Sequence, residues 1–272
     1  MPELPEVESV ARALRQNLAG RRLTGLEAPF AGVLDQPLRT TRRALLDKRL
    51  VDVHRRGKYM IASFARDGGD DPAHLMIHLR MTGQIFILDG YRPDKHVHVS
   101  FDFEGLPVHY RDVRKFGRLT LVEDPLAPAA LAHVGPDMLA VRWPEWRRRV
   151  GSRTAPIKAV LLDQGVASGL GNIYVDECLF LAGVRPTTPA AALDDATLRE
   201  ILRRARQVLR LAIDHGGTTF LNFTDFYGKP GNFRRQLRVY GRAGEPCRAC
   251  GGALAKTTVA GRTSVYCPDC QV

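Results

Sequence analysis

The residues best suited to covalent chemistry lie at the start of the chain. Removal of Met1 leaves Pro2 at the N-terminus, where its secondary amine is next to the carboxylate of Glu3. A terminal amine has a pKa of about 7.7–8.0, so about a tenth of it is free base near pH 7, whereas a lysine side chain is almost fully protonated. Pro2 can therefore act as a nucleophile, and its attack on a sugar C1′ would give an iminium ion. Glu3 could then carry protons to or from the sugar.

The same residues also suit the beginning of a helix. Pro5 is favoured in a first turn, and Glu6 and Glu8 lie where the helix dipole is positive. Apolar residues then follow at helical spacing before Gly20: Val7, Val10, Ala11, Leu14 and Leu18. These residues alone do not separate a helix start from a catalytic terminus.

The C-terminal segment has a cysteine pattern typical of a metal site. Cys247-x2-Cys250 and Cys267-x2-Cys270 are separated by sixteen residues, a spacing that predicts one structural zinc ion with four thiolate ligands. Two disulfides are the alternative, but the N-terminus lacks the basic region and apolar core of a secretion signal. Cys178 lies in an apolar helical run and is expected to be a buried thiol.

The charge of the chain favours a polyanionic partner. Lysine and arginine number 40 against 29 acidic residues, a net charge of +11. The excess is concentrated in residues 226–272, which hold eight basic side chains and two acidic ones. A local basic module of this kind indicates nucleic acid. No run of eighteen apolar residues occurs, so no membrane contact is expected.

The pattern of elements predicts an α+β chain. Seven strand-like segments are joined by short turns: Leu50–His54, Tyr59–Phe64, His74–Leu79, Gln84–Leu88, His96–Phe103, Leu106–Tyr110 and Leu119–Glu123. This spacing predicts an antiparallel β-sandwich or flattened barrel, with the N-terminal helix packed on it.

Helical periodicity replaces the strand pattern after about residue 125. Helices are expected from Ile157 to Gln164, from Asn172 to Phe180 with Asn172 as the N-cap, and over 195–215. The glycine-rich turn before Asn172 could cradle a phosphate, with plain helix packing as the alternative. The expected domains are a catalytic sandwich (1–132), a linker with a first helix (133–150), a helix-two-turns-helix domain (151–235) and a zinc finger (236–272).

Five short motifs follow one another along the chain. Each is weak alone, but together and in this order they resemble the formamidopyrimidine-DNA glycosylases, bacterial base-excision enzymes for oxidised purines. The motifs are Pro2-Glu3-Leu4-Pro5-Glu6-Val7-Glu8, His78-Leu79-Arg80-Met81-Thr82-Gly83, Arg114-Lys115-Phe116-Gly117, Gln164-x4-Gly169-x-Gly171-Asn172-Ile173-Tyr174-x2-Glu177, and Val239-Tyr240-Gly241-Arg242 followed by the cysteine pairs.

The resemblance implies a bifunctional DNA glycosylase and AP lyase that cuts the strand by β- and then δ-elimination. It implies that Pro2 is the nucleophile, Glu3 the acid/base at the sugar and Glu6 a supporting carboxylate. Lys58 is implied to bind a phosphate near the active site, although its turn position alone suggests a solvated lysine.

The resemblance also implies DNA contacts. His78, Asn172 and Arg262 would contact phosphates beside the flipped nucleotide, and Tyr240 and Lys229 would add backbone or base contacts.

Met81, Arg114 and Phe116 resemble the trio that fills the hole left by an everted base. Eversion costs a few kcal/mol of stacking and pairing, which an apolar wedge, an aromatic ring and an arginine can partly restore. From residue type alone, two core residues and a surface arginine are the alternative.

The loop 217–232 corresponds to the family's lid over the extruded base. Leu221 lies where some relatives are expected to carry a basic residue, a departure from the family pattern in the part of the loop expected to hold the lesion. The expected enzyme is a monomer that binds damaged double-stranded DNA in the bacterial cytoplasm, at the nucleoid. Rival interpretations are an endonuclease VIII-like enzyme for oxidised pyrimidines, which Leu4 and the wedge trio disfavour, and a non-catalytic zinc-finger protein.

Overall fold

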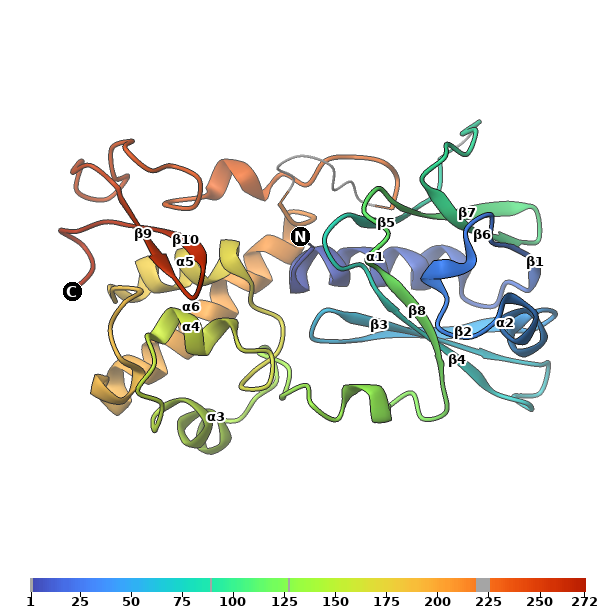
Figure 1. The fold of residues 1–272 in the computed structure, drawn as a ribbon, viewed down its shortest axis with the longest axis horizontal. Coiled ribbons are helices and arrows are strands. Elements are labelled where there is room, and N and C mark those ends of the chain that lie inside the picture. The colour runs from blue at the N-terminus through green and yellow to red at the C-terminus, as the bar shows by residue number, and fades with distance from the viewer. Residues whose placement is uncertain (1, 89, 127, 219–225) are drawn as a thin grey trace. The chain divides into compact units, whose positions relative to one another are not determined.

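The computed structural model describes residues 2–88, 90–126, 128–218 and 226–272 (Figure 1). The chain forms two compact units, one of residues 1–132 with 215–232 and the other of residues 133–214 with 233–272. The first unit thus includes the segment 215–232, all of which the sequence analysis assigned to the helix-two-turns-helix domain. The predicted domain boundaries remain a prediction.

The first unit is a sandwich of two four-stranded antiparallel sheets, ordered β1-β6-β7-β5 and β2-β3-β4-β8. Its helices are α1 (Leu4–Leu18) and α2 (Leu38–Leu45). Its strands are β1 (Leu23–Glu27), β2 (Arg49–Arg56), β3 (Tyr59–Ala65), β4 (Ala73–His78), β5 (Gly83–Phe86), β6 (Val97–Phe103), β7 (Leu106–Asp112) and β8 (Arg118–Val122). The predicted sandwich with a packed N-terminal helix is confirmed.

The core of this unit forms where α1 meets the two sheets. Leu14 and Leu18 of α1 belong to one buried cluster with the inward residues of both sheets. Phe64 of β3 and Phe103 of β6 stack across it with ring centroids 6.4 Å apart. Burial of this apolar surface holds the helix on the sandwich, and so fixes the start of the chain.

Two elements of this unit were not predicted. Strand β1 lacks the alternation of buried and exposed residues by which a strand is predicted. Its register shifts between Leu23 and Gly25, and its buried residues are three apart. Helix α2 buries only Thr41 and Leu45 among its eight residues, so its apolar stripe is too weak to recognise. Strand β5 also ends before the predicted Leu88, because the N–H of Ile87 donates to the carbonyl of Phe226 at 2.8 Å.

The second unit is helical and ends in a β-hairpin. Its helices are α3 (Trp143–Val150), α4 (Ile157–Leu162), α5 (Asn172–Ala182) and α6 (Asp195–Asp214), and its hairpin strands are β9 (Ala255–Val259) and β10 (Arg262–Tyr266). Short 3-10 helices cover Ala31–Val33 and Ala129–Leu131 in the first unit, and Ala190–Ala192 and Phe233–Gln236 in the second.

The structure corrects two predictions at α4 and α5. The N-cap of α5 is Gly171, and Asn172 is the first helical residue, with its side chain directed to Thr263. Helix α4 ends at Leu162 because Gln164 serves the following turn. The Gln164 amide donates to the carbonyls of Leu162 and Leu170 and accepts an N–H from Gly169.

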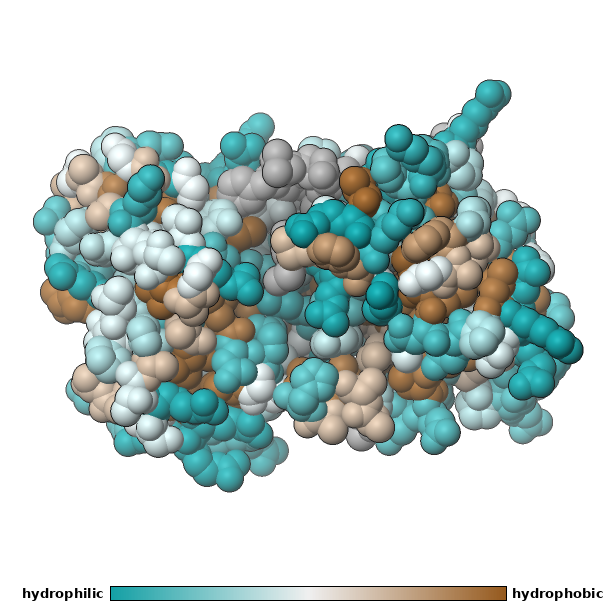
Figure 2. All heavy atoms as spheres, viewed as in Figure 1, coloured by the Kyte–Doolittle hydropathy of each residue, from teal (hydrophilic) through white to brown (hydrophobic). Residues whose placement is uncertain are grey.

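Figure 2 shows that hydrophilic residues cover much of the face drawn, with smaller hydrophobic areas between them. Among the described residues, none of the helices combines the length and apolar character needed to cross a bilayer.

Candidate active site and nucleic-acid interface

The proposed nucleophile lies directly before a capped helix. Pro2 and Glu3 are both buried, and Glu3 is the N-cap of α1. Glu3 and Glu6 form a capping box, in which the N–H of Glu3 donates to Oε2 of Glu6 at 2.7 Å. The same residues therefore start the helix and form the candidate active site, because the capping box fixes the backbone next to Pro2.

Glu6 also connects the N-terminus to the loop that follows α6. Its Oε1 accepts the N–H of Thr218 at 2.7 Å, and its side chain is fully buried. Gly217 has a φ of +81°, and a Cβ there would lie 2.7 Å from Oε1 of Glu6. The two oxygens of Glu6 hold backbone groups from two segments, so the geometry suits a supporting carboxylate rather than a proton carrier.

Lys58 lies in the two-residue hairpin loop between β2 and β3, after Gly57 with its φ of +59°. Only 6% of the lysine is exposed, which excludes the solvated turn lysine that its position alone suggested. A buried lysine is uncommon unless it has partners or a function.

Arg55 connects this hairpin to α1. It donates to Glu8 at 2.7 Å and to the carbonyl of Gly57 at 2.9 Å. Burial alone would raise the pKa of Glu8, but hydrogen bonds from Arg55 and Arg12 outweigh it and lower that pKa. The ionised Glu8 therefore holds the Lys58 hairpin against the helix that begins beside Pro2.

His78 ends β4 and pairs in register with Tyr59, the residue after Lys58. Burial, together with the charges of Arg80 and Lys58, lowers the pKa of His78 to about 3. Its Nδ1 accepts the N–H of Arg80 at 3.1 Å, so the neutral ring carries its proton on Nε2. His78 can therefore contact a phosphate as a neutral donor, beside the cationic Lys58.

The candidate wedge residues are exposed, unlike the core residues that their types suggested. Met81 is 40% and Phe116 is 49% exposed, and the Arg114 guanidinium lies 4.5 Å from the centroid of the Phe116 ring. The residues before them, Arg80 and Lys115, have φ of +52° and +60°. Left-handed backbone in non-glycine residues is typical of functional loops.

In the second unit, Asn172 and Arg262 are brought together by the finger hairpin. Asn172 donates one amide N–H to the carbonyl of Thr263 at 3.1 Å, and Arg262 is the exposed residue before Thr263. The second N–H of that amide can meet a phosphate.

Lys158 and Asp176, which sequence reasoning did not single out, hold this hairpin on α5. Both side chains are buried, and Nζ of Lys158 donates to Asp176 at 2.7 Å and to the carbonyl of Thr263 at 2.9 Å. Asp176 also accepts from the hydroxyl of Ser264 and the N–H of Val265. A lysine and an aspartate eighteen residues apart give no signal in one sequence that they meet.

Glu177 positions the segment that contains Tyr240. Its buried carboxylate accepts three backbone N–H groups, from Arg238 at 2.8 Å and from Val239 and Tyr240 at 2.9 Å. Burial raises the pKa of Glu177, while these donors favour its ionised form. The side chain of Tyr240 is half-buried.

The part of the predicted lid that is described is anchored in the first unit. Phe226 is fully buried in the sandwich core, and the hydroxyl of Tyr227 accepts from Asn17 of α1 at 2.8 Å. Lys229 is exposed. Leu221 lies outside the described residues.

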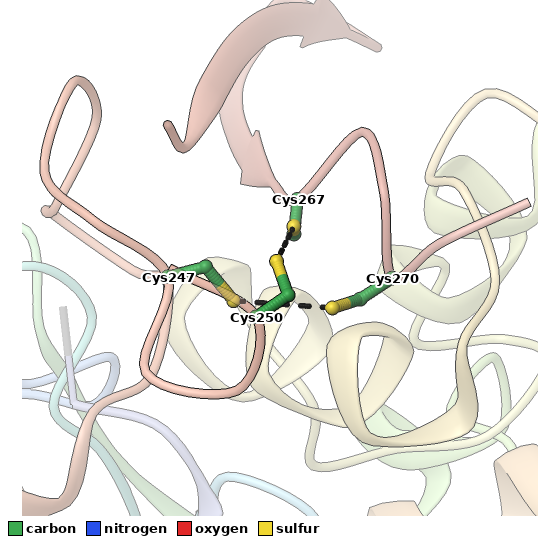
Figure 3. A group of neighbouring side chains, drawn as sticks. All are labelled: Cys247, Cys250, Cys267 and Cys270. Atoms are coloured by element: carbon green, nitrogen blue, oxygen red, sulfur yellow. Dashed lines mark hydrogen bonds between the residues drawn. The ribbon is translucent and has the colours of Figure 1, made fainter. Parts of the chain in front are cut away.

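The four predicted zinc ligands form one cluster (Figure 3). Their sulfur atoms all lie within 4.8 Å of one another, with Cys247–Cys270 at 4.0 Å and Cys250–Cys267 at 3.5 Å. Tetrahedral zinc with bonds of about 2.3 Å would separate its sulfur ligands by about 3.8 Å. None of these four cysteines forms a disulfide, so all four thiolates can bind a structural zinc ion. Cys178 is a buried thiol, as expected.

Backbone donors further suit the cluster to a metal. The N–H groups of Ala249 and Gly252 donate to the sulfurs of Cys247 and Cys250 at 3.4 Å. Such bonds stabilise the thiolate form that a metal requires.

Three family models match successive parts of the chain. The formamidopyrimidine-DNA glycosylase N-terminal domain matches residues 1–119, the formamidopyrimidine-DNA glycosylase H2TH domain matches residues 134–224, and the zinc finger found in FPG and IleRS matches residues 244–272.

Curated relatives and solved structures agree with these matches. The formamidopyrimidine-DNA glycosylase of Desulfitobacterium hafniense (strain DSM 10664 / DCB-2) is 38% identical over 278 residues, with both chains covered completely. A Lactococcus lactis FPG mutant in complex with a Fapy-dG containing DNA is 33% identical, with a TM-score of 0.91 over 99% of each chain. MutM (FPG) from Thermus thermophilus is 36% identical, with a TM-score of 0.86 over 99% of this chain and 98% of its own.

Proposed function

Because this chain belongs to the formamidopyrimidine-DNA glycosylase family over its full length, we propose that it excises oxidised purines from duplex DNA and cuts the resulting abasic site. It is a bifunctional glycosylase and AP lyase. The observation that carries the proposal for its chemistry is the buried Pro2-Glu3 pair at the cap of α1, held by Glu6.

The chemistry begins when the amine of Pro2, unmasked by loss of Met1, attacks C1′ of the damaged nucleotide. The N–C1′ bond forms, the glycosidic bond breaks, and the base leaves with a proton. The lone pair of the proline nitrogen then expels O4′, so the C1′–O4′ bond breaks, O4′ takes a proton, and the secondary amine becomes a cationic iminium. This cation withdraws electrons and acidifies C2′. Loss of a C2′ proton then breaks the bond from C3′ to its phosphate oxygen. Loss of a C4′ proton in a second elimination breaks the bond from C5′ to its phosphate oxygen, and each phosphate leaves as the end of a DNA strand. Glu3 transfers protons at the sugar.

The remaining site residues bind and deform the DNA. Lys58 supplies a cation and His78 a neutral N–H donor to phosphates near the reacting sugar. Asn172 and Arg262 contact phosphates from the second unit, with further contacts from Tyr240 and Lys229. Such contacts position the duplex without reading its sequence.

Met81, Arg114 and Phe116 occupy the space vacated by the everted base. The exposure of Met81 and Phe116 supports this role, because a wedge must reach the duplex. Arg114 can donate hydrogen bonds to the orphaned partner base.

Zinc is structural in this function. Four cysteine ligands leave no open coordination position for substrate, so the ion would fold the finger that presents Arg262. We place the enzyme in the bacterial cytoplasm as a monomer that works at the nucleoid.

Borohydride trapping tests the proposed nucleophile. Reduction of the iminium should join the protein covalently to DNA with 8-oxoguanine or an abasic site, and a form that retains Met1 should not be trapped. Mass spectrometry of the N-terminus must accompany the experiment. Undiminished trapping with Met1 retained would refute the assignment of Pro2.

Oxidised pyrimidines are a second candidate substrate class. Wild-type Lactococcus lactis FPG, 34% identical with a TM-score of 0.89 over 99% of each chain, has been solved in complex with an oxidized pyrimidine containing DNA. Parallel cleavage of duplexes with 8-oxoguanine and thymine glycol ranks the two classes, and faster cleavage of thymine glycol would contradict the preference for purines.

A further inference from the structure

Asp112, at the end of β7, is a buried carboxylate that the proposed function does not use. None of its surface is exposed. Its Oδ2 accepts the N–H of Gly117 at 2.8 Å and the hydroxyl of Tyr110 at 3.2 Å, and its Oδ1 accepts the N–H of Arg114 at 3.1 Å. One side chain therefore fixes both ends of the loop that carries Arg114 and Phe116.

The same carboxylate reaches the loop that carries Met81. The hydroxyl of Thr82 donates to Oδ1 of Asp112, and the Thr82 oxygen accepts the N–H of Arg114 at 3.1 Å. The bonded groups belong to the wedge residues or to the residues next to them. Thr82 follows Met81, Gly117 follows Phe116, and the N–H of Arg114 itself donates to Asp112 and Thr82. Each wedge residue is thus within one residue of a group bound to Asp112 or Thr82.

Other contacts show why these loops need a brace. Arg80 and Lys115 have left-handed backbone, which is unfavourable for non-glycine residues unless neighbouring contacts impose it. Gly117 is packed so closely that a Cβ there would lie 1.8 Å from the Tyr110 hydroxyl. The Lys115 ammonium lies 4.1 Å from the ring centroid of Phe30.

We infer that Asp112 and Thr82 are positioning residues for base eversion, holding Met81, Arg114 and Phe116 as one preorganised wedge. This inference rests on the proposed void-filling role of that trio. A side chain that is ordered only after it enters DNA loses conformational freedom at that moment, which weakens its stabilisation of the everted state. The Asp112–Thr82 brace fixes the backbone beforehand, so the three side chains enter together.

Thr82→Val tests the brace, because it removes the hydroxyl at nearly constant volume, and Thr82→Ser should restore function. Excision of 8-oxoguanine from a duplex, in a single turnover, should slow about tenfold or more in Thr82→Val. Borohydride trapping on a single-stranded abasic oligonucleotide, which has no stacked base to displace, should change less than about twofold. Thr24→Val is the matched control, since Thr24 makes the same kind of bond to Asp102 on β6, at 2.7 Å.

A double-mutant cycle with Phe116→Ala separates positioning from general stability. If the brace acts through the wedge, Thr82→Val should cost little more in the Phe116→Ala background. Additive losses, equal loss in both assays, or equal loss in Thr24→Val would overturn the inference. If Thr82→Val excised 8-oxoguanine at the normal rate while Phe116→Ala was slow, the inference would also be overturned, but the proposed role of the wedge would stand. A Phe116→Ala variant of normal rate would instead refute the proposed role of the trio.

Discussion

At Gly217, the addition of a single methyl group should disturb the active site. Its φ of +81° disfavours any side chain, and its Cβ would crowd Oε1 of Glu6 at 2.7 Å. Gly217→Ala should therefore displace Glu6, shift the backbone of Glu3 and slow iminium trapping on abasic DNA about tenfold or more. Trapping rate and thermal midpoint should be measured together.

Gly216→Ala is the matched control for this prediction. Gly216 has a φ of +71°, but within the described part of the chain no atom beyond its two neighbours lies within 4 Å of its Cβ position. Both variants pay the cost of left-handed alanine, about 1 kcal/mol, and only Gly217→Ala contacts Glu6. Equal trapping rates in the two variants would show that Glu6 does not transmit the change.

His78 makes a prediction about pH. Its pKa of about 3 in the folded protein lies below the usual 6.5. The unfolded chain therefore binds the proton first on acidification, and the folded state loses stability as pH falls from about 6.5 towards 3. Between pH 7 and about pH 5.5 this loss is about 1 kcal/mol.

His78→Gln should remove that part of the pH dependence while keeping an N–H donor for phosphate. Urea unfolding of both proteins at the two pH values measures it. His74 and His109, whose pKa values are also lowered by burial, are present in both and cancel. If the free energy of unfolding depended on pH identically in the two proteins, the pKa of His78 would be the same in the folded and unfolded states.

At this scale the sequence indicated which residues to examine but not their surroundings. Lys58 was named from the family resemblance and Phe116 from one of its motifs, yet turn position and residue type favoured a solvated lysine and a core phenylalanine. Their actual burial and exposure depend on tertiary contacts. The sequence gives no signal that Asp112 reaches the loop of Met81, because Thr82 lies thirty residues away and meets it only in space.

At the scale of elements, the attachment of the finger hairpin to α5 depends on the buried Lys158–Asp176 pair. Removing one member leaves a buried charge without its partner, which costs about 3–5 kcal/mol. Lys158→Met and Asp176→Asn should each destabilise the second unit by about that amount in urea unfolding. Lys158→Met combined with Asp176→Asn should cost clearly less than the sum of the two single changes, because the two losses share one interaction.

Additivity in this cycle would mean that the two charges are stabilised independently. Arg203→Ala is a suitable control, because Arg203 forms an exposed ion pair with Glu200 on α6 at 2.6 Å. Exposed pairs of this kind contribute at most about 1 kcal/mol.

The elements that sequence predicted best have strong local patterns. The hairpin of β2 and β3 follows from hydrophobic runs on both sides of Arg56-Gly57-Lys58. The N-cap of α5 was predicted at Asn172, one residue after the actual N-cap, Gly171. The Asn172 amide donates to the finger hairpin instead of capping the helix. Local propensity favours a cap there, and the tertiary contact with Thr263 overrides it.

At the scale of the whole molecule, the proposed DNA contacts come from both units, and their coupling to zinc can be tested. Arg262 lies between the two cysteine pairs and starts β10. Cys247→Ser should release zinc and lower affinity for a lesion-bearing duplex about tenfold or more, because second-unit phosphate contacts lose their scaffold. Zinc content and duplex affinity at fixed salt are the measurements.

The sandwich should survive this change, because its core is built within residues 1–132 and 226. Trapping on a single-stranded abasic oligonucleotide at saturating DNA should therefore persist in Cys247→Ser. Cys178→Ala is the control, since that buried thiol lies in α5 outside the cluster and should leave zinc in place. Unchanged affinity in a zinc-free Cys247→Ser protein would remove the finger from DNA binding. Loss of trapping along with affinity would instead mean that the N-terminal site depends on the metal.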